Sequence, residues 1–374
     1  MRPFRRSLAA AWIGAAALVL GAPLLAQNDQ PQGQFEGRVD VREVLLDVLV
    51  TDKKGNVIVG LDKNDFVVKE DGKPVDLTGI TFYSNSRFLE SQQETAKKGI
   101  SVDRVPEDRY FILFYEDQKT KAVDAPRLLT QQILAGRESR EWLQRGMLPS
   151  DWVAVVSYDQ KLIVHQDFTH DKRLLLQAVN EAIKSKDPGA NWPSRIKNDG
   201  GPSLVANLPR GNALRDKTPT IYEALQEVAD AAGQVTGRKN LLLFTPGFGR
   251  VDDFGLFTPD PRYYPPMMQA LNDNNVAVYP IDLWPAGTDH PLASAMNKLA
   301  LDTGGTYYFN FTNFSTPLEQ VAKENSGYYL LSYRATHPSD KNGFQKVEVT
   351  TKNPEFRIRA REGYEYGGSQ GAAK

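Results

Sequence analysis

The stretch "RYFILFYEDQKTK" (109–121) decides the fold. Its run "YFILFY" (110–115) is apolar on both faces, which is typical of a central strand in a parallel sheet covered by helices on both sides. The run stops at two carboxylates, Glu116 and Asp117, and then enters a polar loop. In an open α/β sheet, ligands bind outside the carboxyl ends of the strands. The stretch therefore predicts a buried central strand with a candidate site at its end.

Strand and helix patterns alternate after this stretch, which predicts a doubly wound, mostly parallel α/β domain over residues 108–335. The turn at Asp159-Gln160 joins two of the strands and predicts an antiparallel hairpin at a sheet edge. The patterns place strands at 151–159, 161–168, 239–247, 276–284, 306–310 and 328–335, and helices at 123–147, 171–185, 218–235, 260–275, 290–305 and 315–327. Residues 186–217 are rich in Pro and Gly, and they predict an insertion loop rather than core.

Small β modules are expected before and after this domain. Residues 39–84 contain a turn at "KKGN" (53–56), a returning strand "VIVG" (57–60), and a second hairpin around Asp71-Gly72. Residues 336–365 form two alternating strands. The remaining segments are a linker at 27–38, a connector at 85–107 and a disordered tail at 366–374. Calcium binding in the first module, through Asp52, Asn56, Asp62 and Asn64, is an alternative to hairpin turns, which use the same residue types.

The first 26 residues have the pattern of a secretory signal peptide. Arg2, Arg5 and Arg6 precede an apolar run, and "LLA" precedes Gln27. An uncleaved membrane anchor is the alternative, but the run is short and is interrupted by glycine and proline. The sequence therefore predicts a secreted or periplasmic protein with no membrane insertion after cleavage.

Charge and cysteine content exclude several classes of function. The chain has 45 Lys and Arg and 46 Asp and Glu, and the leader holds three of the arginines, so 42 basic residues face 46 acidic ones in the remainder. This balance gives no electrostatic basis for binding nucleic acid. The absence of cysteine excludes thiol catalysis, cysteine zinc sites and iron–sulfur clusters.

Motifs for nucleotide binding and hydrolysis are weak or missing. The Gly-x-Gly in "TPGFGRVDD" (245–253) lacks the third glycine, and there is no phosphate loop ending in Gly-Lys-Ser/Thr. The four histidines are scattered and have no metal-binding spacing: His165, His170, His290 and His337. Aromatic and proline residues cluster near strand ends, where they either cap the core or line a binding face: Tyr263, Tyr264, Pro265, Pro266, Trp284 and Pro285.

Several of these patterns, in this order and spacing, resemble one known family. "LDVLVTDKKGNVIVGLDKNDFVVKEDGKPV", "RYFILFYEDQ", "TPTIYEAL", "LALDTGGTYYFN" and the closing "YYLLSYRATHPSDKNGFQKVEVTTKNPEFRIRAREGYE" are similar to segments of the secreted acidobacterial VWFA-related domain family. The resemblance covers roughly residues 38–365 and implies a von Willebrand factor type A fold. It adds more about fold than about function.

The resemblance also implies where a divalent cation would bind. Type A domains hold Mg²⁺ or Ca²⁺ with an Asp-x-Ser-x-Ser loop, a threonine and a later aspartate. Asp117 falls at the first position and Thr218 at the threonine, but Lys119 and Lys121 replace the serines, and a charged ammonium cannot ligate a cation. Pro246 replaces the later aspartate. We therefore expect a degenerate site and no cofactor.

Three alternatives for these residues remain open. Glu116 can take the first position instead, which brings Gln118 and Thr120 into the pattern. Asp252 and Asp253 lie nearby in sequence as replacements for the later aspartate, although a Gly-rich turn separates them from it. Glu116 and Asp117 can equally be loop acids paired with nearby basic residues, Lys119, Lys121 or Arg127. Thr218 can be a helix N-cap ahead of Pro219.

The function expected from these observations is an exported, non-catalytic module that binds a protein partner through the carboxyl edge of the sheet and the 186–217 insertion. This rests on analogy at the level of the fold. The alternatives are an Mg²⁺- or Ca²⁺-dependent adhesion domain using Asp117 and Thr218, a structural role in an envelope assembly, and a cell-envelope hydrolase using Glu116 and Asp117. The hydrolase is disfavoured because adjacent strand residues point to opposite faces. The sequence assigns no oligomeric state.

Overall fold

The computed structural model describes residues 43–84, 108–116, 125–184, 201–288, 290–336 and 343–366. All of them belong to one compact unit, Val41–Lys374. The predicted signal peptide (1–26), the linker (27–38), the connector (85–107), the loop residues Asp117 to Lys121 and residues 367–374 of the tail lie outside the described residues. No helix in the described ranges is long and apolar enough to span a bilayer.

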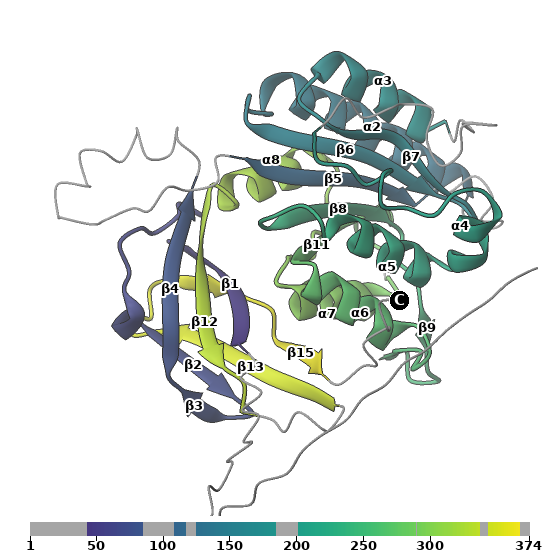
Figure 1. Ribbon diagram of the computed structural model, residues 1–374. Coiled ribbons are helices and arrows are strands. Elements are labelled where there is room, and N and C mark those ends of the chain that lie inside the picture. Colours follow the sequence, from purple (N-terminus) through teal and green to yellow (C-terminus); the bar gives the residue numbers. More distant parts are fainter. Residues whose placement is uncertain are drawn as a thin grey trace, which may run out of the picture. The chain divides into compact units, whose positions relative to one another are not determined.

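A five-stranded sheet lies at the centre of the α/β domain (Figure 1). Its order is β11-β8-β5-β6-β7, and only the edge strand β7 runs antiparallel to its neighbour. The doubly wound, mostly parallel sheet and the antiparallel hairpin at its edge are both confirmed. The strands are β5 (Arg109–Glu116), β6 (Asp151–Tyr158), β7 (Leu162–Thr169), β8 (Lys239–Thr245) and β11 (Val276–Asp282).

Helices cover both faces of this sheet, because the strands present apolar side chains to both sides (Figure 1). On β5, Phe111, Leu113 and Tyr115 belong to one core, whereas Ile112 and Phe114 belong to the other. The first core is closed by α2 (Ala125–Arg145), α3 (Lys172–Ala182) and α8 (Ser315–Glu324). The second is closed by α5 (Ile221–Ala232), α6 (Tyr264–Asp273) and α7 (Ala293–Thr303).

The segments before and after the α/β domain combine into two four-stranded sheets, which we call the β unit. The sheet orders are β14-β1-β12-β4 and β15-β13-β2-β3, and the apolar faces of these strands share one core. The predicted hairpin around Asp71-Gly72 joins β2 to β3, and both turn residues have positive φ, 47° and 77°. The elements are β1 (Glu43–Thr51), the 3-10 helix η1 (Lys63–Asp65), β2 (Phe66–Glu70), β3 (Lys73–Val75), β4 (Leu77–Ser84), β12 (Gly327–Arg334), β13 (Gly343–Thr351), β14 (Arg357–Arg359) and β15 (Gly363–Tyr366).

Strand β12 was expected to be the last strand of the α/β sheet, and that expectation is wrong. It pairs with β1 and β4 inside the β unit. Every second residue of β12 is buried, including Tyr329, Leu331 and Tyr333, and the residues between them are partly exposed. Such alternation is typical of a strand with one covered face. The strands of the central sheet, in contrast, are covered on both faces.

Two other predicted strands are reduced to single bridges. The 306–310 segment contributes only the parallel bridge between Tyr308 and Ile281, and the 57–60 segment only the bridge between Val57 and Thr51. Asp52 closes the preceding turn by accepting hydrogen bonds from the amides of Lys54 and Asn56, each at 2.8 Å.

The described part of the predicted insertion, 201–217, contains core residues, contrary to the prediction. Leu204, Leu208 and Leu214 are buried against the α5 side of the sheet, and α4 (Asn212–Lys217) forms within the segment. Asp167, buried on β7, accepts hydrogen bonds from the Leu204 amide at 2.8 Å and the Ser203 hydroxyl at 2.6 Å. A buried carboxylate therefore fixes this segment to the edge strand.

Candidate functional site

A cavity of about 520 Å³ opens at the carboxyl ends of β5, β6 and β8. This is the part of a doubly wound sheet where ligands bind. Its wall combines aromatic rings, carboxylates and the beginning of α5. The lining residues are Glu116, Tyr158, Asp159, Gln160, Pro219, Thr220, Ile221, Tyr222, Phe248, Gly249, Arg250, Asp260 and Tyr263.

Glu116 ends β5 on the floor of the cavity and is 4% exposed. Its carboxylate accepts a hydrogen bond from the hydroxyl of Thr245, the last residue of the neighbouring strand β8. The Thr245 hydroxyl oxygen in turn accepts the amide of Gly247 at 2.9 Å. These contacts link two strand ends to the loop that follows β8.

The segment before α5 is fixed by two threonines with different roles. Thr218 is buried, and its hydroxyl donates to the Leu214 carbonyl at 2.8 Å, while the Tyr158 hydroxyl donates to the Thr218 carbonyl at 3.1 Å. The N-cap of α5 is Thr220, which forms a capping box with Glu223. Thr218 is therefore not the N-cap, because the reciprocal hydrogen bonds with Glu223 are available only to Thr220.

The pKa of Tyr158 reflects the negative charges around the cavity floor. Burial raises its pKa above the ordinary value, and the charges of Glu223, Glu116 and Asp159 raise it further. Three carboxylates therefore act on the same ring from α5, β5 and the β6–β7 turn.

The loop after β8 requires its two glycines. Gly247 and Gly249 have φ of 94° and 118°, a region that glycine adopts most readily. A Cβ at Gly249 would lie 2.5 Å from the Phe257 ring and 3.1 Å from the Tyr222 hydroxyl. The Gly-x-Gly pattern thus serves backbone geometry and close packing at the cavity wall.

A histidine that the sequence patterns did not single out holds this loop. His290 Nε2 lies 2.7 Å from the Pro246 carbonyl oxygen, and Nδ1 lies 2.8 Å from an Asp282 carboxylate oxygen. The Tyr307 hydroxyl donates to the same carboxylate at 2.6 Å, and the Trp284 ring stacks on the imidazole. A carbonyl oxygen can only accept, so Nε2 donates the hydrogen bond to Pro246.

A short hairpin, β9 (Arg250–Val251) and β10 (Phe257–Thr258), borders the cavity. Asp252 fixes its tip by accepting the amides of Phe254 and Leu256, each at 2.9 Å. The tip presents two apolar side chains to solvent, because Phe254 is 88% exposed and Leu256 61% exposed.

Another part of the cavity wall carries a paired aspartate and aromatic rings. Arg262 binds both carboxylate oxygens of Asp260, at 3.1 and 2.8 Å, and lies 5.0 Å from the centre of the Tyr263 ring. Hydrogen bonding to Arg262 lowers the pKa of Asp260 to about 2. Tyr222 stacks on Tyr263 and meets Phe248 edge to face.

The structure brings together only some of the residues predicted for a metal site. Glu116 and Thr218 lie near the cavity floor, where Thr245 and Leu214 engage them. Asp252 is at the hairpin tip, and Asp117 lies outside the described residues. In the described ranges no three His, Cys, Asp or Glu side chains lie together in a way that could hold a metal ion.

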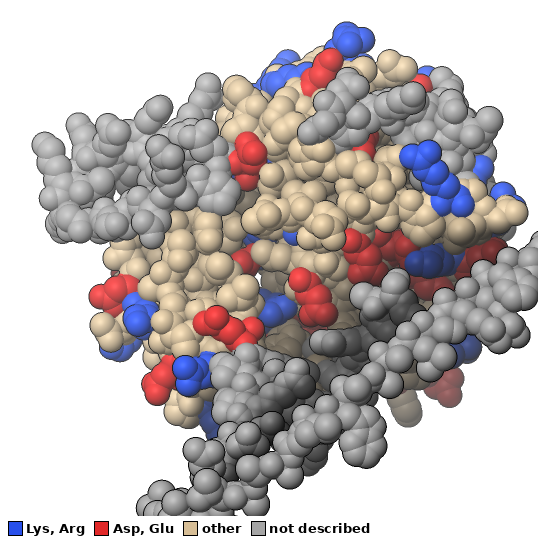
Figure 2. All heavy atoms as spheres, in the orientation of Figure 1, with Lys and Arg blue, Asp and Glu red and all other residues tan. Residues whose placement is uncertain are grey.

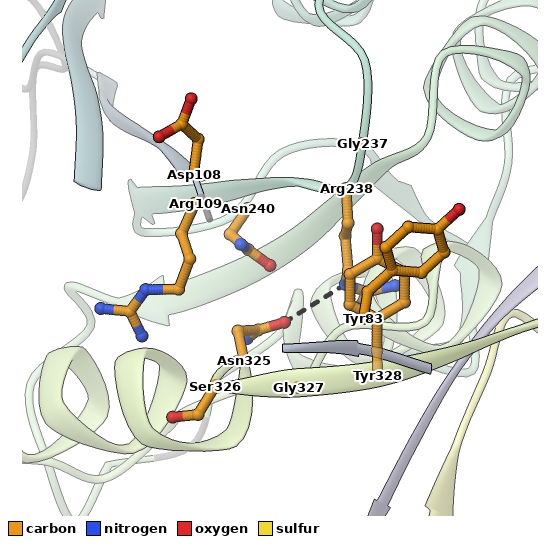
Figure 3. Close-up of a pocket in the computed structure, with 10 residues that line it drawn as sticks. All are labelled: Tyr83, Asp108, Arg109, Gly237, Arg238, Asn240, Asn325, Ser326, Gly327 and Tyr328. Atoms are coloured by element: carbon orange, nitrogen blue, oxygen red, sulfur yellow. Dashed lines mark hydrogen bonds between the residues drawn. The ribbon is translucent and has the colours of Figure 1, made fainter. Parts of the chain in front are cut away.

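A second pocket, of about 30 Å³, lies at the amino ends of β5 and β8 (Figure 3). Arg238 donates to the Asn325 carboxamide oxygen at 3.2 Å, and the rings of Tyr83 and Tyr328 stack at 5.2 Å. Arg109 and Asn240 also line this pocket. A volume of this size accommodates about one water molecule, so we consider only the larger cavity as a candidate site.

No protein-family model and no curated protein matches the sequence. Solved structures with a similar fold include the vWF domain of the type V pili tip protein Mfa5 from Porphyromonas gingivalis, at 13% identity and a TM-score of 0.37, over 58% of this chain and 94% of that one. Conserved hypothetical protein BatB from Bacteroides thetaiotaomicron matches at 14% identity and a TM-score of 0.34, over 58% and 97%. Proximal thread matrix protein 1 from the mussel byssus matches at 13% and 0.34, over 59% of this chain and 48% of its own length.

The fold is a doubly wound, mostly parallel α/β fold. It has a mostly parallel sheet, one antiparallel edge strand and helices on both faces. The likeness to these solved structures is distant and concerns the fold alone.

Proposed function

We propose that this chain is an exported, non-catalytic protein-binding module of the von Willebrand factor type A kind, with a degenerate metal-ion-dependent adhesion site. The observation that carries the proposal is the 520 Å³ cavity at the carboxyl ends of the strands beside an exposed apolar hairpin. Deep cavities with aromatic walls and exposed aromatic side chains are features of protein interfaces.

Two features of the cavity support recognition without a metal ion. The Glu116 carboxylate and the Thr218 hydroxyl are engaged by neighbouring protein groups, and Pro246 supplies a carbonyl to His290 where the family pattern has a carboxylate. Lys119 and Lys121 stand at the serine positions of that pattern. We include membership in the acidobacterial VWFA-related family, and a secreted or periplasmic location, in the same proposal.

Site-specific crosslinking at the hairpin tests the proposed interface. A photoreactive benzoylphenylalanine replaces Phe254 in the full chain, expressed in its native cells. The matched control places it at Ile133, an apolar residue of α2 that is 52% exposed. We expect one protein to be recovered from position 254 and not from position 133, equally with EDTA and with Mg²⁺.

The recovered protein is then purified, and its binding is measured directly. Phe254→Ser should weaken binding about tenfold or more, as truncation of a central aromatic anchor does, without changing the melting temperature. Equal crosslinking at both positions would contradict the proposed interface. Loss of binding in EDTA, restored by Mg²⁺ or Ca²⁺, would favour the alternative in which Asp117 and Thr218 hold a cation.

A further inference from the structure

We propose that two copies of this chain associate through the edge strand β4, which pairs antiparallel with β4 of the second copy about a two-fold axis at Thr81. The pairing joins the four-stranded sheets of the two copies into one continuous sheet. This surface belongs to the β unit and does not depend on the interface proposed at the carboxyl ends of the central sheet.

Strand β4 is the last strand of its sheet and has a partner on one side only (Figure 1). Its eight residues, Leu77–Ser84, pair with β12. Within the described ranges, no hydrogen bond joins the backbone of its outer edge to another segment. The unpaired N–H and C=O groups of such an edge are a template for a further strand.

The other outer strands of the β unit and of the central sheet are short, charged or covered, which are the usual protections against edge-to-edge pairing. β3 has three residues and includes Lys73 and Pro74, while β14 has three residues and includes Arg357 and Arg359. β15 has four residues. In the central sheet, β7 is buried and the 201–217 segment is fixed to it, and a bridge from the segment after α7 covers the end of β11.

β4 has none of these protections. Its sequence, LTGITFYS, contains no charged residue and no proline. Figure 2 shows uncharged residues at the surface where Figure 1 places the upper part of β4. Leu77, Ile80 and Phe82 pack against the core of the β unit but remain partly exposed. The core is therefore open at this edge, and a further strand would remove these side chains from water.

The sequence of β4 indicates that a second copy is the strand that fits. In an antiparallel pair centred on Thr81, each Thr81 lies opposite its counterpart, and Ile80 lies opposite Phe82 of the second copy. Thr–Thr pairs and pairs of an aromatic with a β-branched side chain are both favourable across strands. Gly79 lies opposite Tyr83, an aromatic ring that covers a position without a side chain. Because the strand has no charge, no like charges meet at the axis.

A bulge limits the length of β4 that pairs regularly. The register with β12 shifts between Ser332 and Tyr333, beside Thr78, and the ladder is regular from Gly79 onwards. Bulges bend a strand and end its pairing. The regular stretch is therefore the one that a two-fold axis at Thr81 uses. A contact of this length buries little area, so we expect a reversible dimer rather than an obligate one.

Sedimentation of the purified full chain tests the association. We expect an equilibrium of monomer and dimer with a Kd on the order of 10 µM. Thr81→Lys places two ammonium groups opposite each other at the axis and should weaken dimerisation at least about tenfold. The matched control, Thr350→Lys, adds the same charge at an exposed position of β13, an interior strand of the other sheet, and should leave dimerisation unchanged.

Cysteine crosslinking tests the register. The chain has no cysteine, so Thr81→Cys introduces a single thiol. At the axis the two thiols belong to directly opposite residues, whose Cα atoms lie within the range that a disulfide spans. Mild oxidation should therefore link the dimer, whereas Thr350→Cys should remain unlinked. This measurement also decides the matter if Thr81→Lys does not fold.

Any of three results would overturn the inference: a chain that stays monomeric up to about 200 µM, equal dimerisation of wild type and folded Thr81→Lys, or equal disulfide formation at positions 81 and 350. Loss of the dimer in Phe254→Ser would overturn it as well, because the dimer would then form through the hairpin. The proposed function is tested by crosslinking at position 254, and its outcome does not depend on these measurements.

Discussion

At the amino end of the central sheet the pocket beside Arg109 and Arg238 encloses about 30 Å³, whereas the cavity at the carboxyl end encloses about 520 Å³. The small pocket is lined by two buried arginines, Arg109 and Arg238, that pair with carboxylates within the protein. Arg109 binds both carboxylate oxygens of Asp151, at 2.7 and 2.8 Å, and Arg238 lies 3.7 Å from the buried Asp47. The cavity is bounded by rings, by the buried Glu116 and by three charged residues that are half-buried or exposed, Asp159, Asp260 and Arg250.

The difference suggests a division of roles: the buried ion pairs at the amino end of the sheet stabilise the fold, and the carboxyl end is the part proposed to bind a partner. Charges at the amino end are removed from water and are stable only with their partners, so that end tolerates little change. At the carboxyl end Asp159, Asp260 and Arg250 remain near solvent, where substitution costs less folding free energy. The following predictions test this contrast, from the largest expected effect to the smallest.

Removing the buried arginine should produce the largest loss of stability. Arg109→Met leaves the fully buried Asp151 without its guanidinium partner, so we expect the free energy of unfolding to fall by about 3–5 kcal/mol. The control is Arg250→Met at the carboxyl end, where the side chain is exposed and the change should stay within about 0.5 kcal/mol. Urea denaturation at pH 7 measures both, and similar losses would contradict the contrast.

Lys239, at the start of β8, should make stability depend on pH above neutrality. Burial lowers its pKa to about 8, against about 10.4 in an unfolded chain. The folded state therefore releases this proton first, and stability should rise between about pH 8 and pH 10.5 by about 2–3 kcal/mol. Lys239→Met removes this contribution. The measurement is the difference in unfolding free energy between wild type and variant across that range, and parallel curves would refute the prediction.

His290 should stabilise the loop after β8 more than it stabilises the whole fold. His290→Phe keeps a ring against Trp284 but leaves the Pro246 carbonyl without its donor, which should cost about 1–3 kcal/mol. Amide exchange at Gly247 should accelerate. The control is His170→Phe, since His170 contacts the Asp151 carbonyl at the amino end and should leave Gly247 exchange unchanged. Equal rates of amide exchange at Gly247 in His290→Phe and His170→Phe would show that His290 does not hold the loop.

Asp260 should have the smallest effect, visible only in acid. Hydrogen bonding to Arg262 lowers its pKa to about 2, so its contribution to stability is complete above the unfolded pKa of about 3.9 and is lost as the pH falls towards 2. Carboxyl NMR should give a midpoint near 2, and Arg262→Gln should raise it towards the ordinary value. An unchanged midpoint in that variant would remove Arg262 as the cause.

Much of the fold could be predicted because short, continuous stretches of sequence determine it. The two-sided apolar run of β5 and the Asp159-Gln160 turn predicted a covered parallel sheet with an antiparallel edge, and both are present. The partner of β12 was not predictable, because alternating burial identifies a strand with one covered face but not the sheet it joins. The burial of Leu204 and Leu208 was not predicted, because the Pro and Gly content of the segment around them is typical of a surface loop.

The position of the candidate site in the fold could be predicted from the sequence, but the set of residues that form it could not. The rule that ligands bind at carboxyl ends led to Glu116 and to the start of α5, and both line the cavity or adjoin it. The His290–Asp282–Pro246 contacts escaped prediction because one partner is a backbone carbonyl, which leaves no trace in the sequence. Thr220 and Glu223 could have been identified from the sequence, because a threonine followed three residues later by a glutamate is the signature of a capping box.

The pairing of β1 with β12 also constrains the order of events during synthesis. Val44 is registered with Tyr333, so nearly the whole α/β domain must emerge from the ribosome before this ladder can form. Contacts between such distant segments form slowly, and domains fold as they are made. The α/β domain can therefore collapse while the Glu43–Val48 stretch still lacks the strand it pairs with. A chain truncated before β12 would retain the nucleus of the central sheet and expose an open apolar strand, a form prone to aggregate.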